Sequence, residues 1–201
     1  MEIRSPRHRP AATRLLIVTP AAPGSLHGNR MTALRWQRQL RALGHPVSIA
    51  NDWNGQPAGA LVALHALRSH DAVLKFRAAH PDRPIVLVLT GTDLYRDLAG
   101  DACRRDRAIA TMHAADRLVV LQDEAAAAVP AELRSKLVTI FQSVPPLERQ
   151  PTSSHRFLVT VIGHLREEKD PFCIVRALRR LPQATALHVL LGGALYALAL
   201  V

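Results

Sequence analysis

The segment Gly28-Asn29-Arg30 carries residue types that suit an anion-binding site. It follows an apolar run at residues 15–18 and stands at the start of a helical pattern. Free backbone N–H groups at a helix start favour an anion, and glycine lets a phosphate approach the backbone closely. The alternative is an ordinary glycine turn in which Asn29 caps the helix. Arg30 opposes the helix dipole at this position, which favours the ligand-binding interpretation.

A second candidate is Thr90-Gly91-Thr92-Asp93, which comes at the end of a strongly apolar run. Ligands bind at the carboxyl edge of a parallel sheet, and two hydroxyls with a carboxylate there could bind a sugar or activate an acceptor. The alternative is a helix N-cap by Thr92 or Asp93, which the sequence satisfies equally well. Further cleft candidates stand at the ends of other predicted strands, namely Gln122, Gln142 and Ser143.

The third candidate is the basic loop at residues 163–170, GHLREEKD. Gly163 leaves room for a ligand, while Arg166 and Lys169 can neutralise a diphosphate. The alternative is a solvated charged loop. Because a strand pattern precedes the loop and Pro171 marks a helix start after it, ligand binding is the favoured interpretation.

The histidines and cysteines outside these segments form no pattern typical of a disulfide framework, a metal site or a catalytic centre. Cys103 and Cys173 fit neither a disulfide framework nor a zinc site. No Ser-His-Asp or Cys-His constellation is apparent, so no catalytic group is assigned, and neither a metal nor a cofactor is expected. The following histidines lack partners at metal-ligand spacing and are interpreted as surface or helix residues: His65, His70, His80, His113 and His155.

Strand and helix patterns alternate along the chain, which predicts βαβ units and a parallel sheet in an α/β fold. Short apolar runs of this kind are typical of buried parallel strands. Strands are predicted at residues 14–20, 47–50, 60–67, 84–90, 117–122 and 137–141, and the main helices at 30–43, 69–80 and 101–115. A loop is predicted at 91–95, a helix at 123–129 and a short turn at 131–136.

The same rhythm predicts two domains. Residues 1–13 form a basic flexible arm, 14–142 a first α/β domain and 143–156 a linker rich in proline and polar residues. Residues 157–201 begin a second domain, with a strand at 157–162, a helix at 171–181 and a strand at 186–191. Because two strands and one helix make a marginal unit, we expect a chain truncated or frameshifted in its second domain.

The amino-acid composition and charge distribution indicate which kinds of partner the protein binds. The 201-residue chain is 48% hydrophobic and 21% charged, values typical of a globular protein. All but three of its 26 basic residues are arginines, and its formal net charge is +10. The charges are scattered without interleaved aromatic residues, so nucleic acid is not the expected partner. No apolar run is long enough to cross a membrane, and no signal-peptide core follows the basic start. A cytoplasmic protein with small-molecule substrates is expected.

Two Rossmann-like units joined by a linker resemble glycosyltransferases of the GT-B architecture. Residues 163–170 resemble the G-R-L-x-x-E-K-G signature of family-4 glycosyltransferases, whose Arg and Lys hold the donor diphosphate. Lys169 matches the family lysine, whereas His164 stands in the place of the usual arginine, a contact that Arg166 could supply. Gly28-Asn29-Arg30 and the helix after it are similar to the amino-terminal signature of the same group.

Several segments together resemble the selenosugar synthases of selenoneine biosynthesis, over residues 14 to 195. The matching segments are 28–33, 89–95, 120–122, 142–143 and 161–172. The resemblance implies transfer of a sugar from a UDP-sugar, UDP-N-acetylglucosamine, to selenophosphate, with a new carbon–selenium bond. In this family the phosphate loop of the second domain holds the leaving diphosphate, and an anionic nucleophile needs no strong base.

The family carries an acidic Glu-x7-Glu-like motif for the donor ribose and sugar, which would lie beyond Val201. We therefore expect weak UDP-sugar binding and slow or absent turnover. Two alternatives remain open: a GT-B enzyme with a hydroxyl acceptor, and a non-catalytic binding protein built on a single Rossmann-like domain. The latter predicts that the last strands pair onto the first sheet.

Overall fold

The computed structural model describes residues 12–146, 148, 157–163, 170–182 and 187–192. Its contacts divide the chain into two compact units, Met1–Val144 and Pro145–Val201. No helix in these described ranges is both long and apolar enough to span a membrane.

The first unit is an α/β fold of Rossmann-like type, built on a six-stranded sheet in which all neighbouring strands are parallel. The strand order is β2-β1-β3-β4-β5-β6. The strands are β1 (Leu15–Val18), β2 (Val47–Ala50), β3 (Ala60–Leu64), β4 (Ile85–Val88), β5 (Arg117–Val120) and β6 (Leu137–Thr139). The sequence prediction of an α/β parallel sheet is confirmed.

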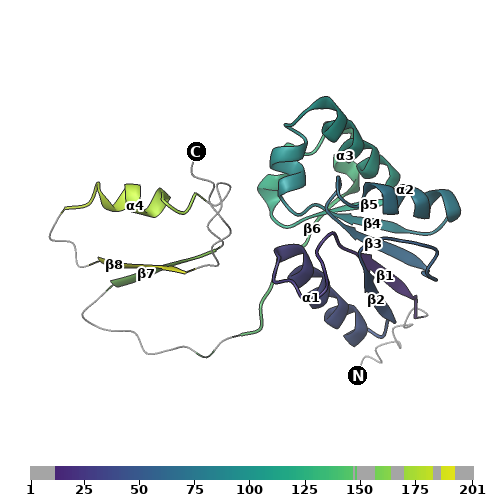
Figure 1. Ribbon diagram of the computed structural model, residues 1–201, viewed down its shortest axis with the longest axis horizontal. Helices are drawn as coiled ribbons and strands as arrows, with labels where there is room; N and C mark the ends of the chain where they lie inside the picture. The colour runs from purple at the N-terminus through teal and green to yellow at the C-terminus, as the bar shows by residue number, and fades with distance from the viewer. Residues whose placement is uncertain (1–11, 147, 149–156, 164–169, 183–186, 193–201) are drawn as a thin grey trace, which may run out of the picture. The chain divides into compact units, whose positions relative to one another are not determined.

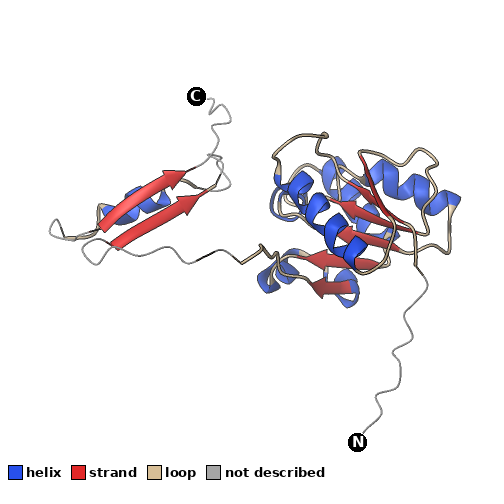
Figure 2. Cartoon of the chain, turned by 90° about the horizontal axis from the view of Figure 1, so that it is seen from below, coloured by secondary structure: helices blue, strands red, loops and turns tan. Residues whose placement is uncertain are grey.

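Helices cover both faces of this sheet (Figures 1 and 2). Helices α2 (His70–Ala79) and α3 (Ala102–Ala114) pack on one face, and α1 (Gly28–Ala42) packs on the other. Successive strand residues point to opposite faces, so Leu16 and Val18 face α2 and α3 while Leu15 and Ile17 face α1. Burial on both faces explains why the inner strands β1, β3 and β4 are continuous apolar runs.

Several element boundaries differ from the sequence prediction, and three of the differences lie in or beside the candidate site segments. Helix α1 begins at Gly28, two residues before the predicted start. Strand β3 ends at Leu64 because His65 turns into the left-handed backbone region, with φ of 77°. The predicted loop after β4 contains a π-helical turn, η1 (Asp93–Asp97).

Two 3-10 helices, η2 (Asp123–Ala128) and η3 (Ala131–Lys136), connect β5 to β6. Each contains six residues, more than the roughly three to four that most 3-10 segments have. They replace the helix and the turn predicted at 123–129 and 131–136.

The second unit contains β7 (Phe157–Ile162), α4 (Cys173–Leu178) and β8 (Leu187–Gly192). Strands β7 and β8 are parallel and pair with each other in their own sheet.

Candidate functional site

The strands of the first unit all end at one edge of the sheet, and the predicted site segments follow those ends. Strands β2 and β3 lie on opposite sides of β1, so the chain reverses its direction of travel across the sheet between β1 and β3. At such a switch point the loops after the two strands diverge and leave a crevice for a ligand. The loops after β1 and β3 therefore border the expected ligand position, and the loop after β4 lies beside them.

The Asp93 carboxylate braces the loop after β4. It is fully buried, and its Oδ1 accepts the backbone N–H groups of Thr90 at 2.9 Å and Gly91 at 2.8 Å. Its Oδ2 accepts the N–H of Ala66, in the loop after β3, at 3.0 Å. Asp93 makes no N-cap hydrogen bond for η1, and neither does Thr92. The carboxylate thus locks two edge loops together, and partly exposed Thr92 is left to face solvent.

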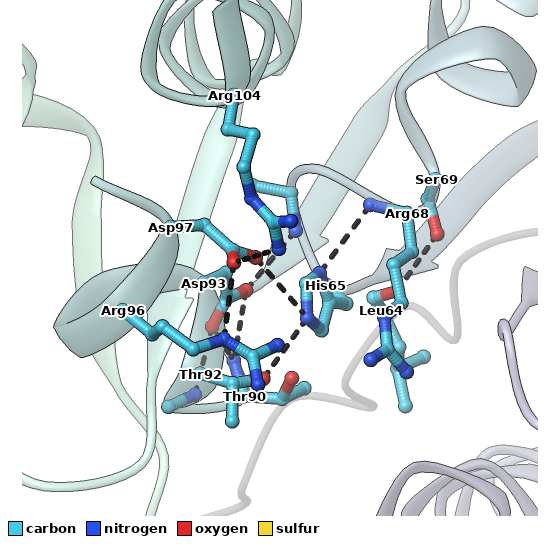
Figure 3. A network of polar contacts seen from close by, with 12 residues as sticks. Leu64, His65, Arg68, Ser69, Thr90, Thr92, Asp93, Arg96, Asp97 and Arg104 are labelled. Atoms are coloured by element: carbon cyan, nitrogen blue, oxygen red, sulfur yellow. Dashed lines mark hydrogen bonds and ion pairs between the residues drawn. The ribbon is translucent and has the colours of Figure 1, made fainter. Parts of the chain in front are cut away.

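His65 is the residue that the sequence interpretation misplaced. It is 1% exposed and lies directly after β3, so the interpretation as a surface or helix residue is wrong. Its Nε2 lies 3.0 Å from Thr92 Oγ1, and its Nδ1 lies 3.3 Å from the N–H of Arg68 (Figure 3). A left-handed histidine costs about 1 kcal/mol or more, and the surrounding contacts must hold it. The rule that selects Thr90, a polar residue at the end of an apolar run, does not select His65, because the apolar run around His65 continues to Leu67.

Asp97 is the second buried acid of this cluster and was not identified from the sequence. Its Oδ1 accepts a hydrogen bond from Arg104 Nη2 at 2.8 Å, and Arg96 Nε lies 3.4 Å from the same oxygen. Its Oδ2 lies 3.6 Å from His65 Nε2 and has no hydrogen-bond partner among the described residues. The partners come from η1, α3 and the loop after β3, so the sequence gives no local signal for the cluster.

The electrostatics of the cluster keep His65 neutral and Asp97 charged. Burial lowers the pKa of His65, and the positive charges of Arg68 and Arg96 lower it further, against the opposing effects of Asp93 and Asp97. Burial would raise the pKa of Asp97, but the hydrogen bond from Arg104 and the other nearby positive groups outweigh it and lower that pKa.

The segment predicted to bind an anion after β1 forms the first turn of α1. Gly28, Asn29 and Arg30 lie inside the helix, and the N-cap is His27, whose side chain makes no capping hydrogen bond. The structure therefore excludes Asn29 as the cap. Arg30 Nε is buried and has no hydrogen-bond partner within the described ranges. The first N–H groups of a helix lack intrahelical acceptors, and no acidic residue stands in this turn. The turn thus presents donors and positive charge.

The other cleft candidates of the first unit lie apart from this cluster or at its border. Gln122 Nε2 donates to the hydroxyl of Tyr95 at 2.9 Å, which joins the loop after β5 to η1. Gln142 is bound to α1, because its Oε1 accepts from Arg35 at 2.9 Å and its Nε2 donates to Thr32 Oγ1 at 3.3 Å.

A separate hollow of about 290 Å³ lies beside α1. Of the sequence-predicted site residues, Gln142 and Ser143 line it, together with Trp36, Leu40 and Phe141. The structure does not bring these two residues into the His65 cluster.

The predicted diphosphate loop belongs to the second unit. Gly163 follows β7, and a side chain added there would meet nothing within 4 Å. His164, Arg166 and Lys169 lie outside the described residues. After the loop, Arg176 of α4 forms an ion pair with Asp170.

Across the described residues, no group of three or more His, Cys, Asp or Glu side chains could hold a metal ion. The carboxyl edge instead offers the first N–H groups of α1, the Thr92 hydroxyl and arginine charges, a set that suits oxyanions. No protein-family model and no curated protein matches this sequence.

Proposed function

We propose that the protein is a glycosyltransferase of the GT-B architecture that transfers a sugar from UDP-N-acetylglucosamine to selenophosphate. Selenium attacks the anomeric carbon, the bond from that carbon to the diphosphate oxygen breaks, and UDP leaves. The observation that carries the proposal is the parallel sheet whose switch point is bordered by the α1 start and the β3 loop. The segments that resemble selenosugar synthases, 28–33 and 89–95, occupy this edge.

The charge of the edge supports an anionic acceptor. Arg30 at the α1 start, Arg68 after β3 and Arg96 in η1 all belong to segments that follow strand ends. A selenophosphate nucleophile is already an anion, so positioning and electrostatic stabilisation replace a strong general base. In this proposal the second unit holds the donor diphosphate through Gly163, Arg166 and Lys169.

The test is UDP release from UDP-N-acetylglucosamine with selenophosphate as the acceptor. Release that depends on selenophosphate, with a selenium-containing sugar detected by mass spectrometry, supports the proposal. Release with hydroxyl-bearing sugar acceptors in place of selenophosphate supports the alternative GT-B enzyme. Absence of turnover together with absence of binding to either substrate contradicts the glycosyltransferase proposal.

One observation favours a second candidate, a non-catalytic binding protein. The Met1–Val144 unit holds the complete six-stranded sheet and buried cores on both of its faces. A unit of this kind can bind an anionic small molecule at its edge without chemistry. Saturable binding of selenophosphate or UDP-sugar with no UDP release and no selenosugar supports this candidate.

A further inference from the structure

The hydrogen-bonding state of His65 follows from its two ring nitrogens. Nδ1 faces the backbone N–H of Arg68 at 3.3 Å, and an N–H can only donate. Nδ1 must therefore be the acceptor, and the single proton of the neutral ring lies on Nε2. The surroundings favour the neutral ring at pH 7, because burial is the largest of the causes that lower the pKa of His65.

The Nε2 proton determines whether the Thr92 hydroxyl accepts or donates in its hydrogen bond with His65. Two oxygens face Nε2, Thr92 Oγ1 at 3.0 Å and Asp97 Oδ2 at 3.6 Å, and only the first lies at hydrogen-bond distance. Thr92 Oγ1 therefore accepts, and its own hydrogen remains to be donated elsewhere. Thr92 is partly exposed at the carboxyl edge, whereas His65 is buried beneath it.

Positive charge lies around the His65 ring that is bonded to this hydroxyl. The charges of Arg68 and Arg96 both act on the His65 ring, and Figure 3 shows their guanidinium groups on either side of it. The two neighbouring carboxylates, Asp93 and Asp97, are bound by groups of the protein itself. Asp93 accepts three backbone N–H groups, and Asp97 is fully buried beside Arg104.

The geometry points to an oxyanion-binding site at Thr92, in which His65 is a positioning residue that makes the Thr92 hydroxyl a donor and Arg68 and Arg96 supply the charge. The ligand is a phosphate-like oxyanion, either a free anion or the diphosphate of a nucleotide. This inference rests on the proposed function in one respect only, namely that ligands bind at this edge of the first unit.

The first experiment measures the His65 tautomer in the intact 201-residue protein by long-range ¹H–¹⁵N NMR at pH 8. The expected result is a neutral ring protonated at Nε2, with a signal that changes in the Thr92→Val variant, which lacks the acceptor oxygen. A ring protonated at Nδ1 overturns the inference, whether or not the protein has transferase activity.

The second experiment titrates the same protein with inorganic phosphate and with UDP. Thr92→Val should weaken binding of the recognised anion about tenfold, as loss of a donor to a charged group predicts, while Thr92→Ser retains near wild-type affinity. Loss of phosphate binding in Thr92→Val identifies a free anion as the ligand, and loss of UDP binding alone identifies the nucleotide diphosphate.

The role of His65 is separated from folding by a double-mutant cycle. His65→Asn removes the Nε2 donor and suits the left-handed backbone. It should weaken anion binding as Thr92→Val does, with no further loss in the double variant. Arg68→Ala should also weaken binding, and Arg38→Ala, an exposed arginine of α1, is the control for a lost charge.

Besides a ring protonated at Nδ1, three binding results overturn the inference: additive losses in the cycle, unchanged affinity in Thr92→Val, or wild-type protein that binds neither anion. If wild-type protein releases UDP and one of these results is also found, the proposed function is retained and only the Thr92 site is rejected.

Discussion

At the residue scale, Asp93 shows how one buried carboxylate can organise an edge of the sheet. Its two oxygens accept backbone N–H groups from Thr90, Gly91 and Ala66. We predict that Asp93→Asn lowers the free energy of unfolding by about 2–3 kcal/mol, because the new amide group faces buried N–H donors and leaves them unsatisfied. Denaturant unfolding monitored by tryptophan fluorescence measures the loss.

The matched control is Asp101→Asn. Asp101 is the exposed N-cap of α3, where its side chain accepts one hydrogen bond from the N–H of Arg104 at 2.9 Å. Asparagine caps helices as well as aspartate does, so the free energy of unfolding should change by less than about 0.5 kcal/mol. Equal losses in the two variants would contradict the bracing role of Asp93.

The residues of the cluster differ in how far the sequence could identify them. Thr90 and Thr92 follow the end of a strongly apolar strand, which is a local signal, whereas His65 lies inside an apolar run that continues to Leu67 and carries no such signal. Asp97 and Arg104 carry none, because their partnership depends on the π-helical turn and on the docking of α3. Burial of a polar residue is a tertiary property, and no local pattern encodes it.

At the element scale, the strands were predictable and the connections were less so. Apolar runs buried on both faces leave few alternatives, and the strand predicted at 84–90 contains β4. The predicted strand at 60–67 extended past Leu64 because its apolar run continues to Leu67, while the backbone of His65 turns. The turn depends on Thr92 and Asp93, which are distant in sequence: Thr92 Oγ1 accepts from His65 Nε2, and Asp93 Oδ2 accepts from the N–H of Ala66.

Arg77 joins several elements of the sheet's α2–α3 face through its planar guanidinium. It donates to the carbonyls of Ala114, Pro81 and Arg83 and forms a 2.7 Å ion pair with Asp116. We predict that Arg77→Lys lowers the free energy of unfolding by about 1–2 kcal/mol. A single ammonium group cannot bond the carbonyls of Pro81 and Arg83 and also those of Ala114 and the Asp116 carboxylate. Thermal or urea unfolding of the purified variant measures this.

Arg107→Lys tests whether the loss of stability in Arg77→Lys comes from the several hydrogen bonds of the Arg77 guanidinium. Arg107 also links α3 to α2, but through one exposed 2.9 Å contact with Asp71. Exposed pairs of this kind contribute little, so the expected change is below about 0.5 kcal/mol. A loss in Arg107→Lys as large as that in Arg77→Lys would contradict the proposed role of Arg77.

At the scale of the whole molecule, the buried titratable groups make the first unit sensitive to acid. Burial is the largest cause that lowers the pKa of His65 and of His70, and Arg107 lowers the pKa of His70 further. Below about pH 6.5 these histidines become protonated in the unfolded chain, whereas in the folded protein they stay neutral to a lower pH. The stability that these groups contribute is therefore present above that pH and is lost as the pH falls.

Asp97 and Asp116 extend the same trend to lower pH. Burial opposes the charged form of each, but Arg104 for Asp97, and the N–H of Ile85 with Arg77 for Asp116, outweigh it and lower both pKa values. Their contribution is present above about pH 4 and is lost as the pH falls through the lowered values. All four groups thus destabilise the fold on acidification.

We predict that the free energy of unfolding falls between pH 7 and pH 5, by at most about 1.4 kcal/mol per pH unit for each of the two histidines. The two tryptophans, Trp36 and Trp53, both lie in the Met1–Val144 unit, so denaturant midpoints followed by their fluorescence report on that unit. His70→Asn should reduce the pH dependence, because asparagine does not titrate and can still donate to Thr111 Oγ1, which lies 2.8 Å from His70 Nδ1. His113→Asn, on the exposed side of α3, is the control for removing an imidazole. A stability that stays constant or rises on acidification to pH 5 would show that His65 and His70 are not held neutral by burial.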